Sequence, residues 1–352
     1  MPSEYAFLVS AAGGPTGFST VRTIRAIWGD RATIVTTDIF PRHLIATPLF
    51  ADMHFVGPLA SDPAWDEFIV ETIKDNNIGI AIPILDREIA NLAQLSEERA
   101  IGCCIAVCPS PKATGICNDK WRCGETLLAA GIAVPPFARA APNCLREGWL
   151  LKAREGAGTG VVRIDAGNIA HALDGIAPER YMLQLAFAGR EVTVDAFVPR
   201  RGGETRAICR ERMETKAGVC SKARLFHDDS ILEIARAIGT VVGLTGAFCF
   251  QIMESEQGAE DWAVIDVNPR TGGGTAMSQT VGFDVIGANL LDALGLDYAY
   301  RLQPLSGEHF VVRQPEDYVT WPKLGDSFRK RRPQLWASRR IPVHRAFAGS
   351  RP

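Results

Sequence analysis

Hydrophobic and polar residues alternate along the chain in two patterns, and the change falls near residue 115. In the first part, short apolar runs are separated by segments whose apolar positions lie three or four residues apart, the spacing of an amphipathic helix. The expected strands are residues 5–10, 32–37, 78–85 and 104–108, and the expected helices are residues 18–28, 64–75 and 87–95. Strands that alternate with helices form βαβ units, so residues 1–115 are predicted to form a parallel α/β domain.

Beyond residue 115 the pattern indicates an α+β region. A helix is expected over residues 118–131, with Asn118 as its N-cap, because asparagine side chains accept hydrogen bonds from the free N–H groups of a first helical turn. Most later apolar runs alternate at period two, as half-buried antiparallel strands do. The expected strands are 149–153, 161–164, 181–187, 189–198, 205–213, 246–253 and 262–268, and the expected helices are 228–243 and 283–295. The predicted fold class is therefore α/β followed by α+β.

Charge and length narrow the classes of function. The chain has 352 residues, enough for two or three domains, and its formal net charge is −2. That balance gives no general attraction to nucleic acid or anionic lipid, so neither is an expected partner. Residues 310–352 carry ten Lys or Arg against three Asp or Glu. A basic tail can bind nucleic acid or an acidic partner, but a proline-punctuated ending of this kind is more typical of a solvated stretch across the surface.

Cysteine usage and hydropathy predict a cytoplasmic protein. The nine cysteines are odd in number and form no CxxC pair, which is typical of reduced thiols in a cytosolic protein. No basic segment precedes the first apolar run, and no stretch of about 18 uncharged apolar residues occurs. We therefore expect neither secretion nor a membrane span.

The stretch VIDVNPRTGGG, residues 264–274, places an acid and an amide at the end of an apolar strand. Because side chains alternate along a strand, Asp266 and Asn268 project from one face, and Gln251 on the preceding strand adds an oxygen across the hairpin. Mg²⁺ takes oxygen ligands and is usually held by a few protein groups together with nucleotide phosphates. These three residues are the candidate metal ligands, and an ordinary strand with a turn is the alternative.

Arg270 follows the acid and the amide and is the candidate catalytic cation. Its planar guanidinium matches phosphate oxygens and would stabilise a transferring phosphoryl group. The glycines at 272–274 leave main-chain N–H groups open to an anion. Arg210 and Arg212 are further candidate contacts for a substrate carboxylate.

A second element is the glycine-rich loop REGAGTG, residues 154–160, which follows Lys152 and leads into another strand rather than a helix. The chain has no GxxxxGK[ST] sequence, so this loop is not a P-loop. A strand–loop–strand hairpin of this kind can fold over phosphates as a lid while Lys152 neutralises their charge. A plain β-hairpin with a flexible tip is the alternative.

A third element is the linker at residues 184–189, which can offer main-chain groups to an adenine edge. Glu191 begins the next strand and can accept ribose hydroxyls, or it is a solvated strand residue. Near the N-terminus, glycines at residues 13–17 follow the first strand and Asp38 closes the second. That arrangement allows a dinucleotide site, but its spacing does not match GxGxxG, and a structural or substrate-facing turn is the alternative.

In this order the segments resemble the ATP-grasp superfamily, in the branch related to the large subunit of carbamoyl phosphate synthetase. The resemblance covers roughly residues 5–295 and is carried by DKW…GIAVPPF, LLKAREGAGTGVV, YMLQLAFAGREVTVD, FCFQIM and VIDVNPRTGGG, with IPILDREIANLA resembling the pre-ATP-grasp domain. It implies a Rossmann-like pre-ATP-grasp domain at 1–115, an ATP-grasp domain at 116–300 with a lid-bearing half (116–188) and a metal-binding half (189–300), and a basic C-terminal extension at 301–352.

The resemblance also implies a role for each candidate residue, with ATP and Mg²⁺ as cofactors, one or two ions, and Mn²⁺ as an alternative. The implied nucleotide contacts are Lys120 and Lys152 at the phosphates, Gly156, Gly158 and Gly160 in the lid, Gln184, Leu185, Ala186 and Phe187 around the adenine, and Glu191 at the ribose, while Gln251, Asp266 and Asn268 bind the metal and Arg270 contacts phosphate. The family usually has Glu where this chain has Asp266, which is shorter and bridges two ions less readily.

The activity implied by the resemblance is that of a ligase. ATP would activate a small carboxylate as an acyl phosphate, and an amine or another nucleophile would displace the phosphate. Its partners would be those small-molecule substrates, and a homodimer is expected by resemblance. Two alternatives remain: a nucleotide-binding ATP-grasp module without turnover, and an NAD-type oxidoreductase that uses the N-terminal domain.

Overall fold

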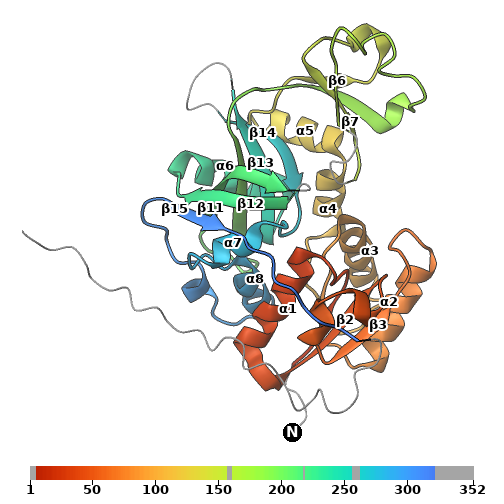
Figure 1. The fold of residues 1–352 in the computed structure, drawn as a ribbon, viewed down its shortest axis with the longest axis vertical. Helices are drawn as coiled ribbons and strands as arrows, with labels where there is room; N and C mark the ends of the chain where they lie inside the picture. The colour runs from red at the N-terminus through yellow and green to blue at the C-terminus, as the bar shows by residue number, and fades with distance from the viewer. Residues whose placement is uncertain (1–4, 157–160, 217–218, 256–261, 322–352) are drawn as a thin grey trace, which may run out of the picture. The chain divides into compact units, whose positions relative to one another are not determined.

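Three β-sheets organise the described part of the chain (Figure 1). This computed structural model describes residues 5–156, 161–216, 219–255 and 262–321. Residues 1–320 group into a single compact unit. The sheets are one parallel and two antiparallel, joined by α-helices, so the predicted mixed fold class is confirmed. None of the described helices is long and apolar enough to cross a membrane.

The N-terminal sheet is parallel and has the strand order β3-β2-β1-β4-β5. Alternate residues of β1 explain why helices cover both faces: Phe7 and Val9 pack into one core, and Leu8 packs into another. The sequence analysis missed β3, a short edge strand whose Phe55 and Val56 are exposed. The elements are β1 Tyr5–Val9, α1 Pro15–Trp28, β2 Ala32–Asp38, β3 Met53–Val56, α2 Ala64–Asp75, β4 Ile80–Ile82, α3 Asp86–Glu97 and β5 Ile105–Ala106.

Two short helices, α4 Pro111–Asn118 and α5 Lys120–Ala129, lead out of this sheet. The predicted N-cap Asn118 is wrong, because Asn118 is the last residue of α4. Asp119 caps α5 instead, and its carboxylate accepts hydrogen bonds from the backbone N–H groups of Trp121 and Arg122 at 3.0 and 3.4 Å. A carboxylate at this position satisfies free N–H groups and complements the helix dipole, which places Lys120 at the first position of α5.

The smaller antiparallel sheet has the order β6-β9-β7-β8. Its strands are β6 Phe137–Arg139, β7 Trp149–Ala153, β8 Val162–Arg163 and β9 Tyr181–Leu185. A small core that contains Leu151, Ile164 and Leu183 holds it together. The sheet carries Lys152 on β7 and Gln184 on β9.

The larger sheet has the order β14-β13-β10-β11-β12-β15. The strand β15, which pairs with β12, lies in the stretch that was predicted as a C-terminal extension, and β12 was also missed. Ile286 and Leu290 of α8 pack in the same core as Phe7 of β1, so this helix joins the large sheet to the parallel sheet. The elements are β10 Glu191–Val198, β11 Arg206–Lys216, β12 Val219–Phe226, α6 Asp229–Val242, β13 Gly246–Glu254, β14 Trp262–Asn268, α7 Thr275–Gln279, α8 Val285–Ala293 and β15 His309–Val312.

The two faces of the large sheet differ in polarity. Val192, Val194 and Phe250 face a core that α6 covers. On β10, Glu191, Thr193 and Asp195 alternate with these apolar residues and therefore project from the opposite face. One face of the sheet thus packs under α6, and the other carries the polar residues of the candidate site beside a second apolar core that contains Phe197 and Ile208.

A buried ion pair anchors the polar face. Asp195 and Arg210 are 1% and 2% exposed, with 3.3 Å between the Arg210 Nε and an Asp195 oxygen. The hydroxyls of Thr275 and Ser278 on α7 donate to the same carboxylate at 2.8 and 2.6 Å. Because every oxygen of Asp195 is used, the cluster locks α7 and the preceding glycine turn against the sheet.

Replacing Asp195 with asparagine is expected to destabilise the protein by about 3–5 kcal/mol, since it leaves the Arg210 charge buried without a counter-charge. The double variant Asp195→Asn/Arg210→Met, which removes that charge, should recover part of the loss. Urea denaturation followed by circular dichroism measures both. An unchanged unfolding midpoint for the single variant would contradict this account of the cluster.

Candidate functional site

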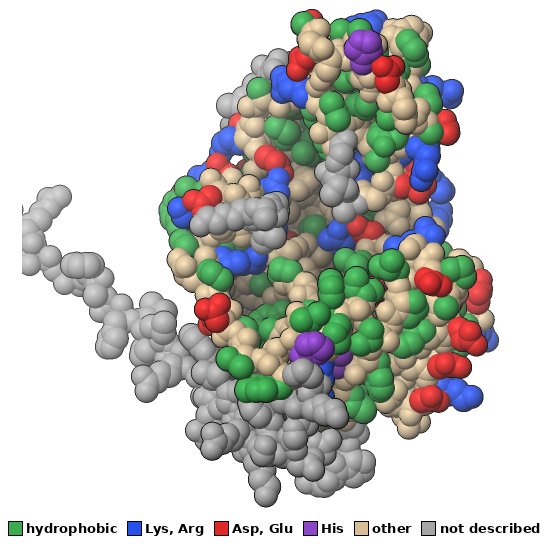
Figure 2. Space-filling view, turned by 45° about the vertical axis from the view of Figure 1, so that its right-hand side comes forward, with side chains coloured by type: hydrophobic (Ala, Val, Ile, Leu, Met, Phe, Trp, Pro, Cys, Tyr) green, Lys and Arg blue, Asp and Glu red, His purple; other side chains and the backbone are tan. Residues whose placement is uncertain are grey.

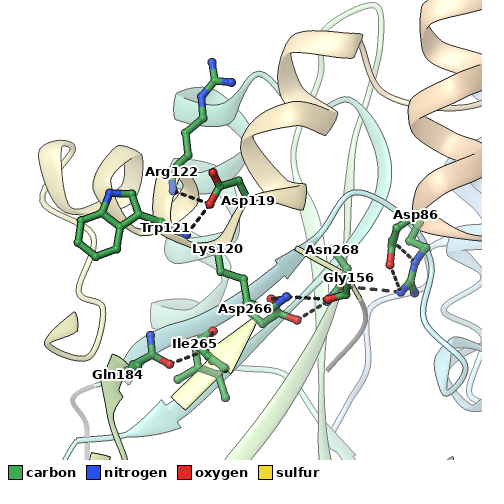
Figure 3. A network of polar contacts seen from close by, with 12 residues as sticks. Asp86, Asp119, Lys120, Trp121, Arg122, Gly156, Gln184, Ile265, Asp266 and Asn268 are labelled. Atoms are coloured by element: carbon green, nitrogen blue, oxygen red, sulfur yellow. Dashed lines mark hydrogen bonds and ion pairs between the residues drawn. The ribbon is translucent and has the colours of Figure 1, made fainter. Parts of the chain in front are cut away.

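The candidate site lies at the end of β14, where Asp266 and Asn268 project from the polar face of the large sheet (Figure 3). The Asn268 amide donates to the Asp266 carboxylate at 3.1 Å. Gln251 is the direct antiparallel partner of Asp266 on β13, so its side chain shares this face. The three predicted metal ligands therefore lie on one face of one hairpin.

A register shift next to this pair exposes a carbonyl. Gln251 pairs with Asp266 and Ile252 pairs with Val264, so Ile265 is an extra, unpaired residue of β14. Such a bulge leaves main-chain groups outside the ladder. The Ile265 carbonyl is then available to accept a hydrogen bond from Lys152 Nζ at 3.2 Å.

Lys152 is the most constrained cation of the site. Its side chain is 8% exposed, and its ammonium donates to Gln184 Oε1 at 2.5 Å as well as to Ile265. Burial lowers the pKa of Lys152 to about 8, although Asp266 opposes the shift. An anion placed beside this ammonium, in addition to Asp266, would stabilise its charged form.

Lys120 lies across from Lys152, at the start of α5. Its ammonium is 4.0 Å from an Asp266 oxygen and donates to the Gly156 carbonyl at 2.9 Å. Gly156 has a φ of +91°, a conformation that favours glycine. The predicted lid residues Gly158 and Gly160 lie outside the described residues. Of the three predicted lid glycines, only Gly156 is therefore placed beside the site.

Arg270 is held by a residue that the sequence analysis did not single out. Its guanidinium forms a two-pronged ion pair with Asp86, at 2.5 and 3.0 Å. Asp86 is the first residue of α3 and lies within the stretch IPILDREIANLA. That stretch was the available signal, but nothing in its spacing showed a contact with Arg270.

The other predicted residues are placed less directly. Glu191 lies two residues along β10 from Thr193, which pairs with Gln251, so it shares the polar face. One of its oxygens pairs with Arg212. Arg210 was a candidate contact for a substrate carboxylate, but it forms a buried ion pair with Asp195 instead.

The adenine linker is partly engaged within the small sheet. The N–H groups of Leu185 and Ala186 donate to the carbonyls of Pro136 and Gly148 at 2.8 and 3.0 Å. Neither of those two donors is free for an adenine edge.

Lys120, Lys152, Gln184 and Asp266 line one narrow cavity of about 20 Å³ between the two antiparallel sheets, room for about one water. Apolar side chains complete the lining: Leu127, Val134, Phe137, Met182 and Val264. The space-filling view in Figure 2 shows this face of the molecule hollowed near its middle, with basic and acidic side chains at the rim.

The cysteines have structural rather than reactive surroundings. All nine cysteines are unpaired, and burial raises the pKa of Cys123 and of Cys249 to about 12, so neither thiol is activated as a nucleophile.

The Asp38 carboxylate accepts hydrogen bonds from the N–H groups of Gly13 and Phe40 at 2.7 and 3.1 Å. Asp38 thus stabilises its own loop, and both of its oxygens are in use where a dinucleotide ribose would need one.

Comparisons with known proteins bear on the fold. Residues 177–314 match a family model described as "ATP-grasp in the biosynthetic pathway with Ter operon". No curated protein sequence matches the chain. Among solved structures, the N5-carboxyaminoimidazole synthetase of Staphylococcus aureus complexed with ADP is 14% identical, with 84% of this chain and 79% of that chain covered and a TM-score of 0.69.

Two further structures are similar. The biotin carboxylase domain dimer of Hydrogenobacter thermophilus 2-oxoglutarate carboxylase, in complex with MgADP, ADP and bicarbonate, is 15% identical, with 86% of this chain and 73% of that chain covered and a TM-score of 0.69. The L-amino acid ligase of Bacillus licheniformis is 13% identical, with 86% and 77% covered and a TM-score of 0.65. The resemblance to the ATP-grasp superfamily is therefore confirmed at the level of the fold.

The depressed pKa of Lys152 predicts a pH-dependent affinity for ATP. Phosphates beside the ammonium would raise its pKa, so binding above pH 8 requires uptake of a proton. We expect the ATP affinity to be about tenfold weaker at pH 9 than at pH 7, as measured by isothermal titration calorimetry in two buffers of different ionisation enthalpy. The variant Lys152→Met should bind ATP more weakly and without this dependence, and a flat profile for the unmodified protein would refute the prediction.

Proposed function

We propose that this chain, which has the ATP-grasp fold, is an ATP-dependent ligase that activates a small carboxylate as an acyl phosphate for attack by an amine or another nucleophile. The observation that carries the proposal is the convergence of Lys120, Lys152, Asp266, Asn268 and Arg270 at one end of β14. Cations, a carboxylate and an amide in this arrangement suit a triphosphate and its counter-ions. The reaction needs no nucleophile from the protein.

Binding of the nucleotide uses both antiparallel sheets. The phosphates are contacted by Lys120 and Lys152, and the lid contains Gly156, Gly158 and Gly160. The adenine is bordered by Gln184, Leu185, Ala186 and Phe187, and a ribose hydroxyl donates to Glu191. The narrow cavity has room for about one water, so a nucleotide bound at these residues would widen the space between the small and large sheets. Lys152 uses two of its three N–H donors on Gln184 and Ile265 and can contact phosphate with the third.

The donor set suits Mg²⁺ when phosphate oxygens complete its coordination. Asp266 supplies one carboxylate, and Gln251 and Asn268 supply neutral amide oxygens. No group of three or more His, Cys, Asp or Glu side chains able to hold a metal occurs in the described part of the chain. This set therefore depends on the nucleotide for most of its negative charge. Bound Mg²⁺ would offset charge on the β- and γ-phosphates.

The proposed reaction has two steps. A carboxylate oxygen of the substrate attacks the γ-phosphorus, the bond from that phosphorus to the β,γ-bridging oxygen breaks, and ADP leaves. The nucleophile then attacks the acyl carbon, inorganic phosphate leaves, and the proton of the amine passes to solvent. Arg270, oriented by Asp86, lies where it can stabilise the transferring phosphoryl group, and a closed lid would keep water from the acyl phosphate.

The variant Asp266→Asn is expected to lose at least 100-fold in magnesium-dependent ADP release, because it removes the carboxylate of the donor set. The assay screens amino acids and other small carboxylates with amines, in Mg²⁺, by a coupled ADP measurement. Asp66→Asn, at an exposed position on α2, is the matched control and should retain full activity.

The outcomes separate the proposal from the alternatives. ATP binding without ADP release on any substrate pair would favour a nucleotide-binding module without turnover. Unchanged activity in Asp266→Asn would refute the assignment of the metal ligands. Quenching of NADH fluorescence by the protein would revive the dinucleotide interpretation.

A further inference from the structure

A second and much larger cavity, of about 1040 Å³, lies between α1 and the C-terminal part of the described chain. None of the described residues lines both this cavity and the narrow cavity under Lys152. Its volume is at the upper end of the range for sites that take drug-sized ligands. The cavity, here called the α1 cleft, is lined by Gly13, Gly14, Phe18 and Arg22 on one side and by Arg301, Arg313 and Tyr318 on the other.

The floor of the α1 cleft is tied together by hydrogen bonds. The Gln279 amide of α7 donates to the Thr23 hydroxyl of α1 at 2.8 Å and to the Asp284 carboxylate at 2.6 Å. Arg301 donates to the other oxygen of Asp284 at 3.1 Å. These contacts satisfy Asp284 and hold the two walls in register.

The outer wall is the segment after β15, residues 313–320, here called the C-terminal strap. Figure 1 shows this segment running past α1 toward β2 and β3. The ring of Tyr318 packs against those of Phe18 and Phe50, with centroids 5.7 and 5.9 Å apart, and the Thr320 hydroxyl donates to the His43 carbonyl at 2.6 Å. The strap thus adds an aromatic face to the cleft.

Two arginines of the cleft lack a carboxylate partner among the described residues. Arg22 is exposed and stacks over the ring of Phe18 at 5.6 Å. Arg313 donates to the Gly273 carbonyl at 2.9 Å through one nitrogen, while its other terminal nitrogen is buried and makes no hydrogen bond there. Burial lowers the pKa of Arg313, as expected for a cation without a counter-charge.

Arg313 also connects the cleft with the phosphoryl-transfer site. Gly273 belongs to the glycine turn that follows Arg270, so the guanidinium of Arg313 lies where the α1 cleft meets that turn. An anion held by Arg313 would sit beside the turn rather than on the far side of the molecule. This places the cleft as an approach to the site for a substrate.

We propose that the α1 cleft binds one of the two ligase substrates, an anion whose carboxylate or phosphate is joined to an aromatic or other planar group. Arg22 and Arg313 supply the counter-charge, and the rings of Phe18 and Tyr318 supply the stacking surface. The assignment of the ligand as a substrate rests on the proposed function. The binding of such an anion does not.

The test uses calorimetry on the full chain with four probes: 2-naphthoate, 2-naphthyl phosphate, the uncharged 2-naphthamide and inorganic phosphate. We expect at least one naphthyl anion to bind at least tenfold more tightly than both naphthamide and inorganic phosphate. The tighter of the two naphthyl anions identifies the anionic group. Naphthamide binding as tightly as both anions would overturn the proposal.

Arginine variants locate the binding site. Arg22→Gln and Arg313→Gln should each weaken binding of the preferred anion at least fivefold, while Arg236→Gln, an exposed position on α6, leaves it unchanged. Arg22 is exposed, so its variant is expected to fold even if Arg313→Gln does not. Wild-type affinity in Arg22→Gln would overturn the inference.

Failure of this inference is distinguishable from failure of the proposed function. If no substrate pair releases ADP but the arginine-dependent binding of the anion persists, the ligase proposal fails and the α1 cleft remains an anion site. If ADP release occurs but no naphthyl anion binds in an arginine-dependent way, the ligase stands and the cleft assignment fails.

Discussion

The buried ammonium of Lys152 is the interaction on which the arrangement of the site depends. It joins Gln184 of the small sheet to the carbonyl of Ile265 in the large sheet, two residues that are far apart in the sequence. The lowering of its pKa from 10.5 to about 8 corresponds to a cost of roughly 3 kcal/mol for keeping the charge buried at neutral pH. Because the unfolded chain would bind a proton more tightly between pH 8 and 10.5, this cost diminishes as the pH rises through that window.

The large sheet accommodates the buried ammonium of Lys152 because its two faces differ in composition. One face is apolar and packs under α6, while the other carries charged and amide groups that pair with one another, beside an apolar core that contains Phe197. The buried Asp195–Arg210 cluster stabilises the end of this polar face and holds α7 against it.

The parallel sheet contributes to the site through few but specific contacts. Asp86 at the start of α3 orients Arg270, and the side chains of α8 share a core with β1. Arg313, which follows the edge strand β15, contacts the glycine turn after Arg270 through the Gly273 carbonyl. Elements from both ends of the chain therefore surround a turn that β14 positions.

Periodicity alone was sufficient for most helices and strands, because long amphipathic patterns reflect burial on one face. It placed Asp266 and Asn268 on one face of a strand and set Lys152 at the end of another. It missed β3, β6, β12 and β15, which are edge strands or strands near an edge with weak apolar alternation, and the short helices α4 and α7. It also misplaced a helix cap by one residue, where two short helices meet.

What the sequence by itself determined is the type of fold and the chemical groups available to the site. Only the tertiary structure decided how those groups are used: that Arg270 pairs with Asp86, that Arg210 is consumed by Asp195, and that a bulge frees the Ile265 carbonyl for Lys152. The physical reason is that periodicity reports local burial, whereas charge pairing depends on distances between segments far apart in the chain, which no local pattern encodes.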